Sequence, residues 1–440
     1  MLRLWKSQLA AKLIVLGSII SVIITGYGNG TARAATSPIA IMYWSSGPTN
    51  GIMPMVNGFN KEYHGTYQVT FRSIPYASEF AQINTALPAH KQPDIMEEST
   101  TPSLYYAYEG LEVPIEPLLH MVGIDPARDF PPATWASTTV NGVHYGAPLD
   151  TFGTLLFYNK KLFKAAGLDP NRPPTNAASF ISDAKKLTIS SKRQWGFMQD
   201  PEKDQNDFEF PSFVYQFGGN MADASTGKIY FGSSAGVKAL TFEWNLIYKD
   251  HVSPVGASTD EFLSEFQRGK AAMTIAGTYA IPGFEQVLGK NLGVALLPVI
   301  GKQQADFIGD NFWWVFKSPS LTSAKERGIA LFMKYWYDHS ALLAQAGIPP
   351  DYLPVLDQSS VLSLPYMKLQ EAAIKYGRLN PLIPNWGTVT GLPLYNQIDL
   401  ALLNRESIPG ALHTAAVETG QLMKSLPGFA DKCDCPVTSG

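Results

Sequence analysis

Strand-like apolar segments alternate with helical segments along most of this chain, and that alternation limits the fold more than any other feature. Residues 39–44 predict a short buried strand, residues 52–63 place apolar side chains at helical spacing, and residues 69–75 alternate as a second strand. This order predicts a strand, helix, strand unit with parallel pairing. The alternation continues through expected strands and helices at residues 94–96, 153–158, 160–166, 177–187, 271–275 and 294–299.

Two further helices have recognisable starts, and one further strand is strongly apolar. A helix is expected after Ser233 or Ser234, and Ser323 with Glu326 has the pattern of a capping box. The run 312–316, which contains Trp313 and Trp314, predicts a buried strand. We therefore expect α/β lobes with largely parallel sheets, in which ligands bind beyond the carboxyl ends of the strands.

Length and composition predict a folded protein of two domains. The 440 residues exceed what one ordinary core holds. With 45% hydrophobic and 16% charged residues, the chain does not have the composition of a disordered protein.

Residues 1–34 have the pattern of a secretory signal peptide. A basic region precedes the apolar stretch 13–24, and Ala32-Arg33-Ala34 is a small-x-small cleavage site. Cleavage after Ala34 is the expectation, with an uncleaved anchor as the alternative. Removal of this segment leaves 30 basic and 37 acidic residues, a net charge of about −7, so bulk electrostatics does not favour nucleic acid.

The number and position of the cysteines exclude a disulfide framework and a lipid anchor on a cysteine after the signal. The chain has 2 cysteines, Cys433 and Cys435, so no disulfide framework holds the fold and no cysteine follows the signal to carry a lipid. Both lie in the polar tail 431–440, which we expect to be a frayed end; a local or intermolecular disulfide is the alternative.

Enzyme signatures are absent from the sequence. There is no nucleophile elbow, no His-Glu-x-x-His, no phosphate-binding loop and no Cys-x-x-Cys, and the 7 histidines are scattered. We expect no cofactor and no metal. The adjacent acids Glu97 and Glu98 point to opposite faces of an extended segment, so they cannot form a catalytic pair with each other. One of them is expected to accept hydrogen bonds from ligand hydroxyls, with solvation at a rim as the alternative.

The segment 158–168 (Tyr-Asn-Lys-Lys-Leu-Phe-Lys-Ala-Ala-Gly-Leu), followed by Pro173-Pro174-Thr175, resembles the hallmark segment of the family 1 extracellular solute-binding proteins. That family includes maltose-binding and glycerol-3-phosphate-binding proteins. Further matches follow in the family's order: Pro93-Asp94-Ile95, Phe217-Gly218-Gly219, residues 266–273, Leu297-Pro298 and the turn Ala346-Gly347-Ile348-Pro349-Pro350. Together they cover nearly all of the chain after the signal.

The resemblance implies the two-lobed periplasmic-binding-protein fold of the Venus flytrap kind, type II-like, with discontinuous α/β lobes joined by hinge strands. It places lobe one at residues 36–148 and 307–356, and lobe two at residues 151–306 and 357–430. The crossings near 148–153 and 305–309 become the expected hinges.

The resemblance also implies ligand-binding residues, on segments that follow the strands or cross between the lobes. Aromatic rings cover the C–H faces of a sugar while acids, amides and hydroxyls bind its hydroxyl groups. For Trp44 and Trp386, ordinary packing is the alternative. The expected residues are Trp44, Ser45, Ser46, Glu98, Ser99, Asp150, Phe152, Tyr279, Asp310, Asn311 and Trp386, with Thr100 and Gly309 beside them.

The implied function is capture of a small polar ligand, a sugar or oligosaccharide, for delivery to the permease subunits of an ABC transporter. The protein is expected to be exported, periplasmic or associated with the cell surface, monomeric and without catalytic activity. A secreted carbohydrate-active hydrolase and a structural or adhesive surface protein are the alternatives. Tyr279 is expected to be the main sugar platform, so that its replacement by Ala weakens binding and hardly changes stability. The alternative is that Tyr279 packs inside lobe two, in which case the Ala variant melts several degrees lower and binds almost normally.

Two departures from the family's pattern narrow the range of expected ligands. No Arg or Lys occurs at the expected positions, which disfavours a phosphorylated ligand. Thr101-Pro102 replaces the Asp-Arg pair that the maltose-binding protein has after its Pro-Asp-Ile segment, so maltose itself is in doubt.

Overall fold

The computed structural model describes residues 37–47, 49–75, 78–199, 208–256, 259–345, 347–426 and 429. The expected signal peptide, the tail with Cys433 and Cys435, and Ala346 of the predicted turn lie outside the described residues. Residues 38–440 form one compact unit. Among the described residues, no helix has both the length and the apolar character needed to cross a membrane.

The first part of the chain runs from β1 to the long strand β6. The predicted strand, helix, strand unit is present, and β1 and β2 are parallel with Ile39 opposite Tyr67. The elements are β1 (Ile39–Ser45), α1 (Thr49–Glu62), β2 (Tyr67–Ser73), α2 (Glu79–Ala86), β3 (Ile95–Glu98), α3 (Thr100–Tyr108), α4 (Glu116–Met121), α5 (Pro126–Asp129), α6 (Pro132–Ser137), β4 (Thr139–Val140), β5 (Val143–His144) and β6 (Ala147–Asn159).

The middle part is mostly helical. Side chains cap two of its helices: Asn159 accepts hydrogen bonds from the backbone of residues 161 and 162, and Asn176 with Ser179 forms a capping box. The elements are α7 (Lys160–Ala165), α8 (Ala177–Leu187), α9 (Glu209–Gln216), β7 (Ala222–Asp223), β8 (Lys228–Ile229), α10 (Ser234–Tyr248), α11 (Thr259–Gln267), β9 (Met273–Gly277), α12 (Ile281–Leu288) and β10 (Leu292–Leu296).

The last part begins with the second long strand. The elements are β11 (Asp306–Val315), α13 (Ser323–His339), α14 (Ala341–Gln345), α15 (Leu353–Leu356), α16 (Ser359–Leu362), α17 (Met367–Tyr376), β12 (Gly377–Arg378), α18 (Trp386–Leu402) and α19 (Ile408–Met423). The expected capping box is wrong by one residue, because Thr322 rather than Ser323 accepts the hydrogen bond from the backbone N–H of Lys325 at 3.2 Å.

The main sheet has the order β10-β6-β11-β3-β1-β2, with β12 beside β11 and β9 beside β6. β1 is parallel to both β2 and β3, whereas β11 is antiparallel to β3 and to β6, and β6 is antiparallel to β9 and β10. The prediction of largely parallel sheets is therefore wrong for the part built on β6, because β9 and β10 run against the long strand.

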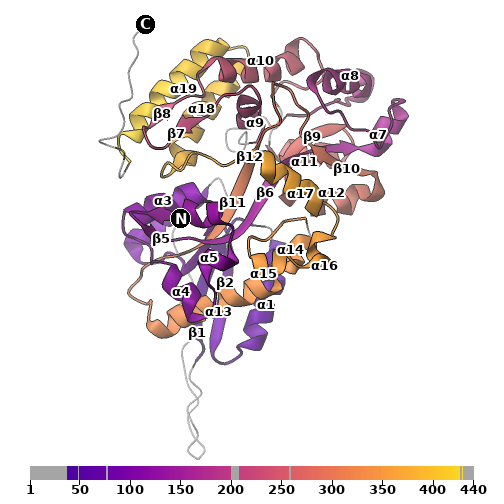
Figure 1. Cartoon of the computed structure of the whole chain (residues 1–440). Helices are drawn as coiled ribbons and strands as arrows, with labels where there is room; N and C mark the ends of the chain where they lie inside the picture. The colour runs from indigo at the N-terminus through magenta and orange to yellow at the C-terminus, as the bar shows by residue number, and fades with distance from the viewer. Residues whose placement is uncertain are drawn as a thin grey trace, which may run out of the picture. The chain divides into compact units, whose positions relative to one another are not determined.

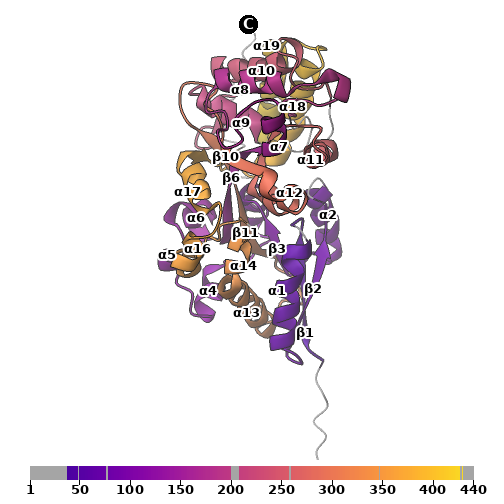
Figure 2. The ribbon, with the colours of Figure 1, turned by 90° about the vertical axis from the view of Figure 1, so that its right-hand side faces the viewer.

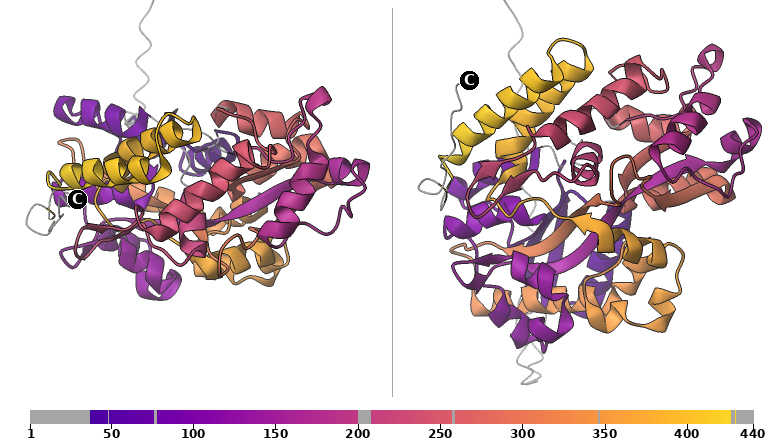
Figure 3. Two further views of the ribbon diagram at one scale, coloured as in Figure 1. Left: turned by 90° about the horizontal axis from the view of Figure 1, so that it is seen from above. Right: turned by 45° about the horizontal axis from the view of Figure 1, so that its top comes forward.

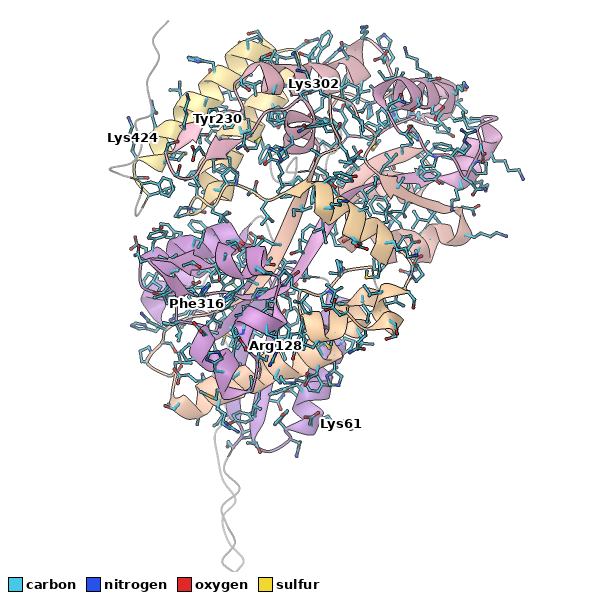
Figure 4. The ribbon with its side chains drawn as sticks, viewed as in Figure 1. Lys61, Arg128, Tyr230, Lys302, Phe316 and Lys424 are labelled. Atoms are coloured by element: carbon cyan, nitrogen blue, oxygen red, sulfur yellow. The ribbon has the colours of Figure 1, made fainter. Side chains whose placement is uncertain are left out.

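The two long strands connect two hydrophobic cores. β6 pairs with β11 through residues 147–153 and with β9 through residues 154–158. Figure 1 shows β6 and β11 side by side, running from the elements around β1, α1 and α13 to those around α9, α10 and α18, and Figure 2 shows the same strands from the side. In Figure 4, Lys61, Arg128 and Phe316 lie with the first group, and Tyr230, Lys302 and Lys424 lie with the second.

Alternation along the strands decides which core each side chain enters. Trp313 and Val315 of β11 join the core of β1, α1 and α13, and both are fully buried, as the apolar run predicted. Leu156 and Tyr158 of β6 face the core of α9, α10, α18 and α19, while Leu155 and Phe157 face the smaller core beside α12. Figure 3 shows α10, α18 and α19 lying against one another over this second part.

Candidate ligand-binding site

The end of β1 brings two hydroxyls and a phenol to the sheet edge. Ser45 is fully buried, and its Oγ accepts a hydrogen bond from the backbone N–H of Gly47 at 2.7 Å. Tyr43 lies two residues earlier on the same face and donates its hydroxyl to Glu97 of β3. Ser46 follows as an exposed residue beside Glu79 of α2.

Two of the acids at this edge are adjacent residues of β3, and they face different partners, as predicted. Glu97 is directed to Tyr43 and Ser45. Glu98 accepts hydrogen bonds from the backbone N–H and the hydroxyl of Ser99 at 2.7 and 2.9 Å. Burial raises the pKa of both carboxyls.

Glu79, the first residue of α2, also lies in this region. Its side chain is only 2% exposed and lies against the carboxyl of Glu98. Burial and the neighbouring Glu98 raise the pKa of Glu79 to about 12. The shift favours the protonated form of Glu79, and a protonated carboxyl can donate a hydrogen bond to a carboxylate such as that of Glu98.

The crossing strands supply two aspartates and an amide. Asp150 and Asn311 are opposite each other on β6 and β11, and Asn311 Nδ2 donates to Asp150 Oδ1 at 3.0 Å. Asp310 accepts from the Thr100 hydroxyl at 2.6 Å and from the Thr100 backbone N–H at 3.3 Å. Burial raises the pKa of Asp310 to about 6, and burial followed by the charges of Glu97, Asp351 and Asp310 raises the pKa of Asp150 well above its usual value.

Asp351 completes the group from the segment after the predicted turn. Thr151 donates its hydroxyl to Asp351 at 3.0 Å, and burial raises the pKa of Asp351 to about 7. We call the six acids Glu79, Glu97, Glu98, Asp150, Asp310 and Asp351 the carboxyl belt, because each of them perturbs, or is perturbed by, at least one other member.

Three aromatic rings form a cluster at β6, and one of them, Phe152, follows Asp150 by two residues on the same face of the strand. The Phe152 and Tyr279 rings are 6.1 Å apart and perpendicular, and each lies near the ring of Phe208, at 6.5 and 6.0 Å. Two glycines leave room for this aromatic trio. A Cβ at Gly309 would lie 2.2 Å from Phe152, and a Cβ at Gly277 would lie 2.6 Å from Tyr279.

The structure thus brings together most of the predicted residues. Ser45, Ser46, Glu98, Ser99, Thr100, Asp150, Asp310 and Asn311 meet around the belt, and Phe152 and Tyr279 lie beside it. The two tryptophans lie in hydrophobic clusters instead. Trp44 is 2% exposed among Ile74, Met96 and Tyr106, and Trp386 is 3% exposed in the core of α18. Packing accounts for the burial of both rings, and their part in binding stays a prediction.

Several residues of the site were not predicted, among them Tyr43 and Thr151, which donate to Glu97 and Asp351. Asp351 directly follows the Pro349-Pro350 turn, and that position was a usable signal. Glu79 reads as an ordinary acid in the first turn of a helix, and Phe208 carries no pattern that distinguishes it from a core residue.

Comparison with known families identifies the chain. Residues 54–363 match the model of the bacterial extracellular solute-binding proteins. The chain belongs to this family. Its members are solute-binding proteins that work outside the cytoplasm, and this chain is one of them.

Relatives and solved structures agree with the family. The sn-glycerol-3-phosphate-binding periplasmic protein UgpB of Brucella melitensis is 26% identical over 327 residues, covering 71% of this chain and 74% of that protein. The GacH receptor of Streptomyces glaucescens, solved without ligand and with acarbose, is 21% identical with a TM-score of 0.78, covering 89% of this chain and all of that one. A solute-binding protein of Thermotoga lettingae bound to α-D-tagatose is 22% identical with a TM-score of 0.77, covering 88% of this chain and all of that one. These likenesses confirm the predicted two-lobed α/β fold.

Proposed function

We propose that this chain captures a sugar or short oligosaccharide between its lobes and delivers it to the permease subunits of an ABC transporter. One observation carries the proposal: Ser45, Glu98, Asp310 and Asp150 lie on four neighbouring strands of the sheet, β1, β3, β11 and β6, and two of these, β6 and β11, pass between the two cores. Hydroxyls and carboxyls of this kind bind sugar hydroxyls, and the Phe152 and Tyr279 rings offer apolar surface for a pyranose face.

The proposed boundaries of the lobes are based on the same two strands, β6 and β11. Lobe one comprises residues 36–148 and 307–356 in this proposal, and lobe two comprises residues 151–306 and 357–430, with hinges at 148–153 and 305–309. The change of pairing partner along β6, from β11 to β9, supports a hinge near residue 153. Val361 and Met367 share the core of β1, so the second chain crossing near residue 357 is expected to lie somewhat later.

The protein acts in this proposal as a monomer, without catalysis, cofactor or nucleic acid. It is exported to the periplasm or the cell surface after removal of residues 1–34. Support comes from the family, whose relatives are named as binding proteins, and from the site, where the belt acids pair with hydroxyls and an amide.

A thermal-shift screen of the mature protein tests the proposal, because a ligand bound by the folded state alone raises the melting temperature. The panel contains monosaccharides, oligosaccharides and sn-glycerol 3-phosphate. We expect a saturable rise with a saccharide and little or none with the phosphate, since the described site residues offer it no Lys or Arg. Turnover of an oligosaccharide that disappears with Glu98→Gln would instead establish a hydrolase. No saturable shift with any compound would favour the structural or adhesive alternative.

A further inference from the structure

The carboxyl belt has no basic partner among the described residues. None of the ion pairs that these residues form includes a belt acid; the acids in those pairs are Glu116, Asp129, Asp250, Glu265, Asp94 and Asp338. Five of the belt acids accept hydrogen bonds instead from Tyr43, Ser99, Thr100, Asn311 and Thr151, which are neutral groups. Buried carboxylates are normally paired with a cation, so positive charge is missing from this site.

The raised pKa values of the belt acids favour their protonated, neutral forms in the ligand-free protein. Burial and mutual repulsion keep the belt carboxyls protonated at higher pH than usual, most clearly at Glu79 and Asp150. This arrangement costs free energy whenever the acids ionise. A bound positive charge would favour their ionised forms and release their protons.

The placement of the belt acids bears on the kind of cation that they could bind. Within the part of the chain that the structure describes, no three His, Cys, Asp or Glu side chains are arranged to hold a metal. The belt acids are instead spread over α2, β3, β6, β11 and the segment before α15. Groups distributed in this way suit a ligand that spans several of them.

A buried side-chain oxygen on a residue that contacts Thr101 also lacks a hydrogen-bond donor among the described residues. Asn385 at the start of α18 donates its backbone N–H to the carbonyl of Thr101 at 2.6 Å, next to the Thr100–Asp310 pair. Its side chain is 5% exposed, and Oδ1 accepts no hydrogen bond from the described residues. A buried oxygen of this kind is costly unless a donor reaches it, and an ammonium group is a donor without acceptor capacity.

We propose that the ligand is a saccharide that carries a protonated amine, bound with its positive charge against the carboxyl belt. This inference rests on the proposed function and adds the charge of the substrate. The aromatic trio is compatible with it, because aromatic faces attract an ammonium as well as the C–H face of a sugar. An anionic ligand would oppose ionisation of the belt acids and would gain no ion pair from them.

Calorimetric titration with three β-1,4-linked disaccharides tests the charge. The diamino disaccharide of glucosamine, its N,N′-diacetyl form and cellobiose differ only in carrying an ammonium, an amide or a hydroxyl at position 2. We expect the diamino compound to bind at least tenfold more tightly than either neutral compound at pH 6. Its binding should also release protons, which is detected by repeating the titration in buffers of different ionisation enthalpy. Cellobiose should release none.

Substitution of a belt acid tests whether the belt causes the preference for the charged disaccharide. Glu97→Gln keeps the shape of the side chain and removes one charge. It should lower the affinity for the diamino compound about tenfold and change the affinity for cellobiose about twofold or less. Glu116→Gln, on the exposed surface of α4, is the matched control and should alter neither affinity. If Glu97→Gln does not fold, the proton release of the unmodified protein still decides the question.

The outcomes separate this inference from the proposed function. Tighter binding of cellobiose or of the diacetyl form overturns the charge inference and leaves the saccharide proposal standing. Choline and its uncharged carbon analogue 3,3-dimethylbutan-1-ol test charge without a saccharide, because they share a shape and differ in charge. Binding of choline alone supports the charge inference and overturns the saccharide proposal, and binding of none of these compounds contradicts both.

Discussion

Thr100 donates its hydroxyl to Asp310 at 2.6 Å and its backbone N–H to the same carboxyl at 3.3 Å, which ties the start of α3 to the crossing strand β11. The two residues are 210 positions apart in the chain. This pair fixes the direction of the Asp310 carboxyl, and its hydrogen bonds favour the ionised form of an acid whose pKa burial raises to about 6.

Thr100→Val tests that pair. The substitution keeps the shape of the side chain and removes the hydroxyl, so a buried carboxyl loses its shorter hydrogen bond and the protein should lose about 1–3 kcal/mol of stability. Urea unfolding at pH 7.5 measures the change. Thr139→Val, at an exposed residue of β4 that contacts His144, is the matched control and should stay within about 0.5 kcal/mol. Equal stability of the two variants would show that the Thr100 hydroxyl is unimportant.

Local patterns predicted many of the elements well. α8 begins at Ala177 and ends at Leu187 as expected, and β11 contains the buried tryptophans Trp313 and Trp314. These elements were predictable because their apolar periodicity and their caps lie within a few residues of each other.

Pairing between distant segments was harder to predict. Nothing in residues 273–277 or 292–296 indicates that these strands run against β6, because direction depends on the whole path of the chain. Parallel pairing was the natural expectation for alternating strands and helices. The site shows the same division: Ser45 and Glu98 follow strands and were predicted, whereas Glu79 meets Glu98 only through the packing of α2.

Gly309→Ala should disturb the aromatic trio. The added Cβ would lie 2.2 Å from the end of the Phe152 ring, so the ring must move. We expect a loss of about 1–3 kcal/mol in stability and weaker ligand binding, because overpacking displaces the ring. Gly387→Ala is the control: its Cβ meets nothing within 4 Å, and it lies in α18, so stability should be unchanged or slightly higher. Normal binding by Gly309→Ala would remove Phe152 from the site.

Stability of the ligand-free protein should fall as the pH rises from about 5 to about 8.5. Burial raises the pKa of Asp310 to about 6, of Asp351 to about 7 and of Asp306 to about 8, all above the values of unfolded chains. The native state therefore binds more protons than the unfolded state in this range. Raising the pH removes those protons and the stability that they contribute.

Urea unfolding of two variants at several pH values checks this dependence. Asp351→Asn should flatten the part of the curve up to about pH 7, since the amide does not titrate beside Thr151, Asp150, Asp310 and Tyr337. Asp223→Asn should leave the curve unchanged, because hydrogen bonds from Ser225 lower the pKa of Asp223 and place its titration at more acidic pH. Stability that rises between pH 5 and 8.5 would contradict the predicted protonation of the buried acids.

Tyr279→Ala should weaken both ligand binding and the fold, a change from the expectation based on sequence alone. That expectation placed the ring at the open face of the site, with hardly any effect on stability. In the structure Tyr279 is half-buried, perpendicular to Phe152 at 6.1 Å and 6.0 Å from Phe208, and it packs against two hydrophobic clusters. Removing the ring therefore leaves a gap between the clusters, with a loss of about 2–4 kcal/mol in stability. It also removes a stacking surface, which should lower saccharide affinity roughly ten- to a hundredfold.

Tyr279→Phe and Tyr279→Trp separate the two effects. Both keep an aromatic surface, so affinity should fall less than about threefold if stacking is the main contribution. Tyr376→Ala, at an exposed tyrosine that ends α17, is the control for loss of a tyrosine and should change neither property appreciably. Calorimetry with the saccharide found in the thermal screen gives the affinities, and urea unfolding gives the stabilities. If Tyr279→Ala melts lower but binds normally, the ring only packs the lobe, and the aromatic part of the proposed site must be assigned to other residues.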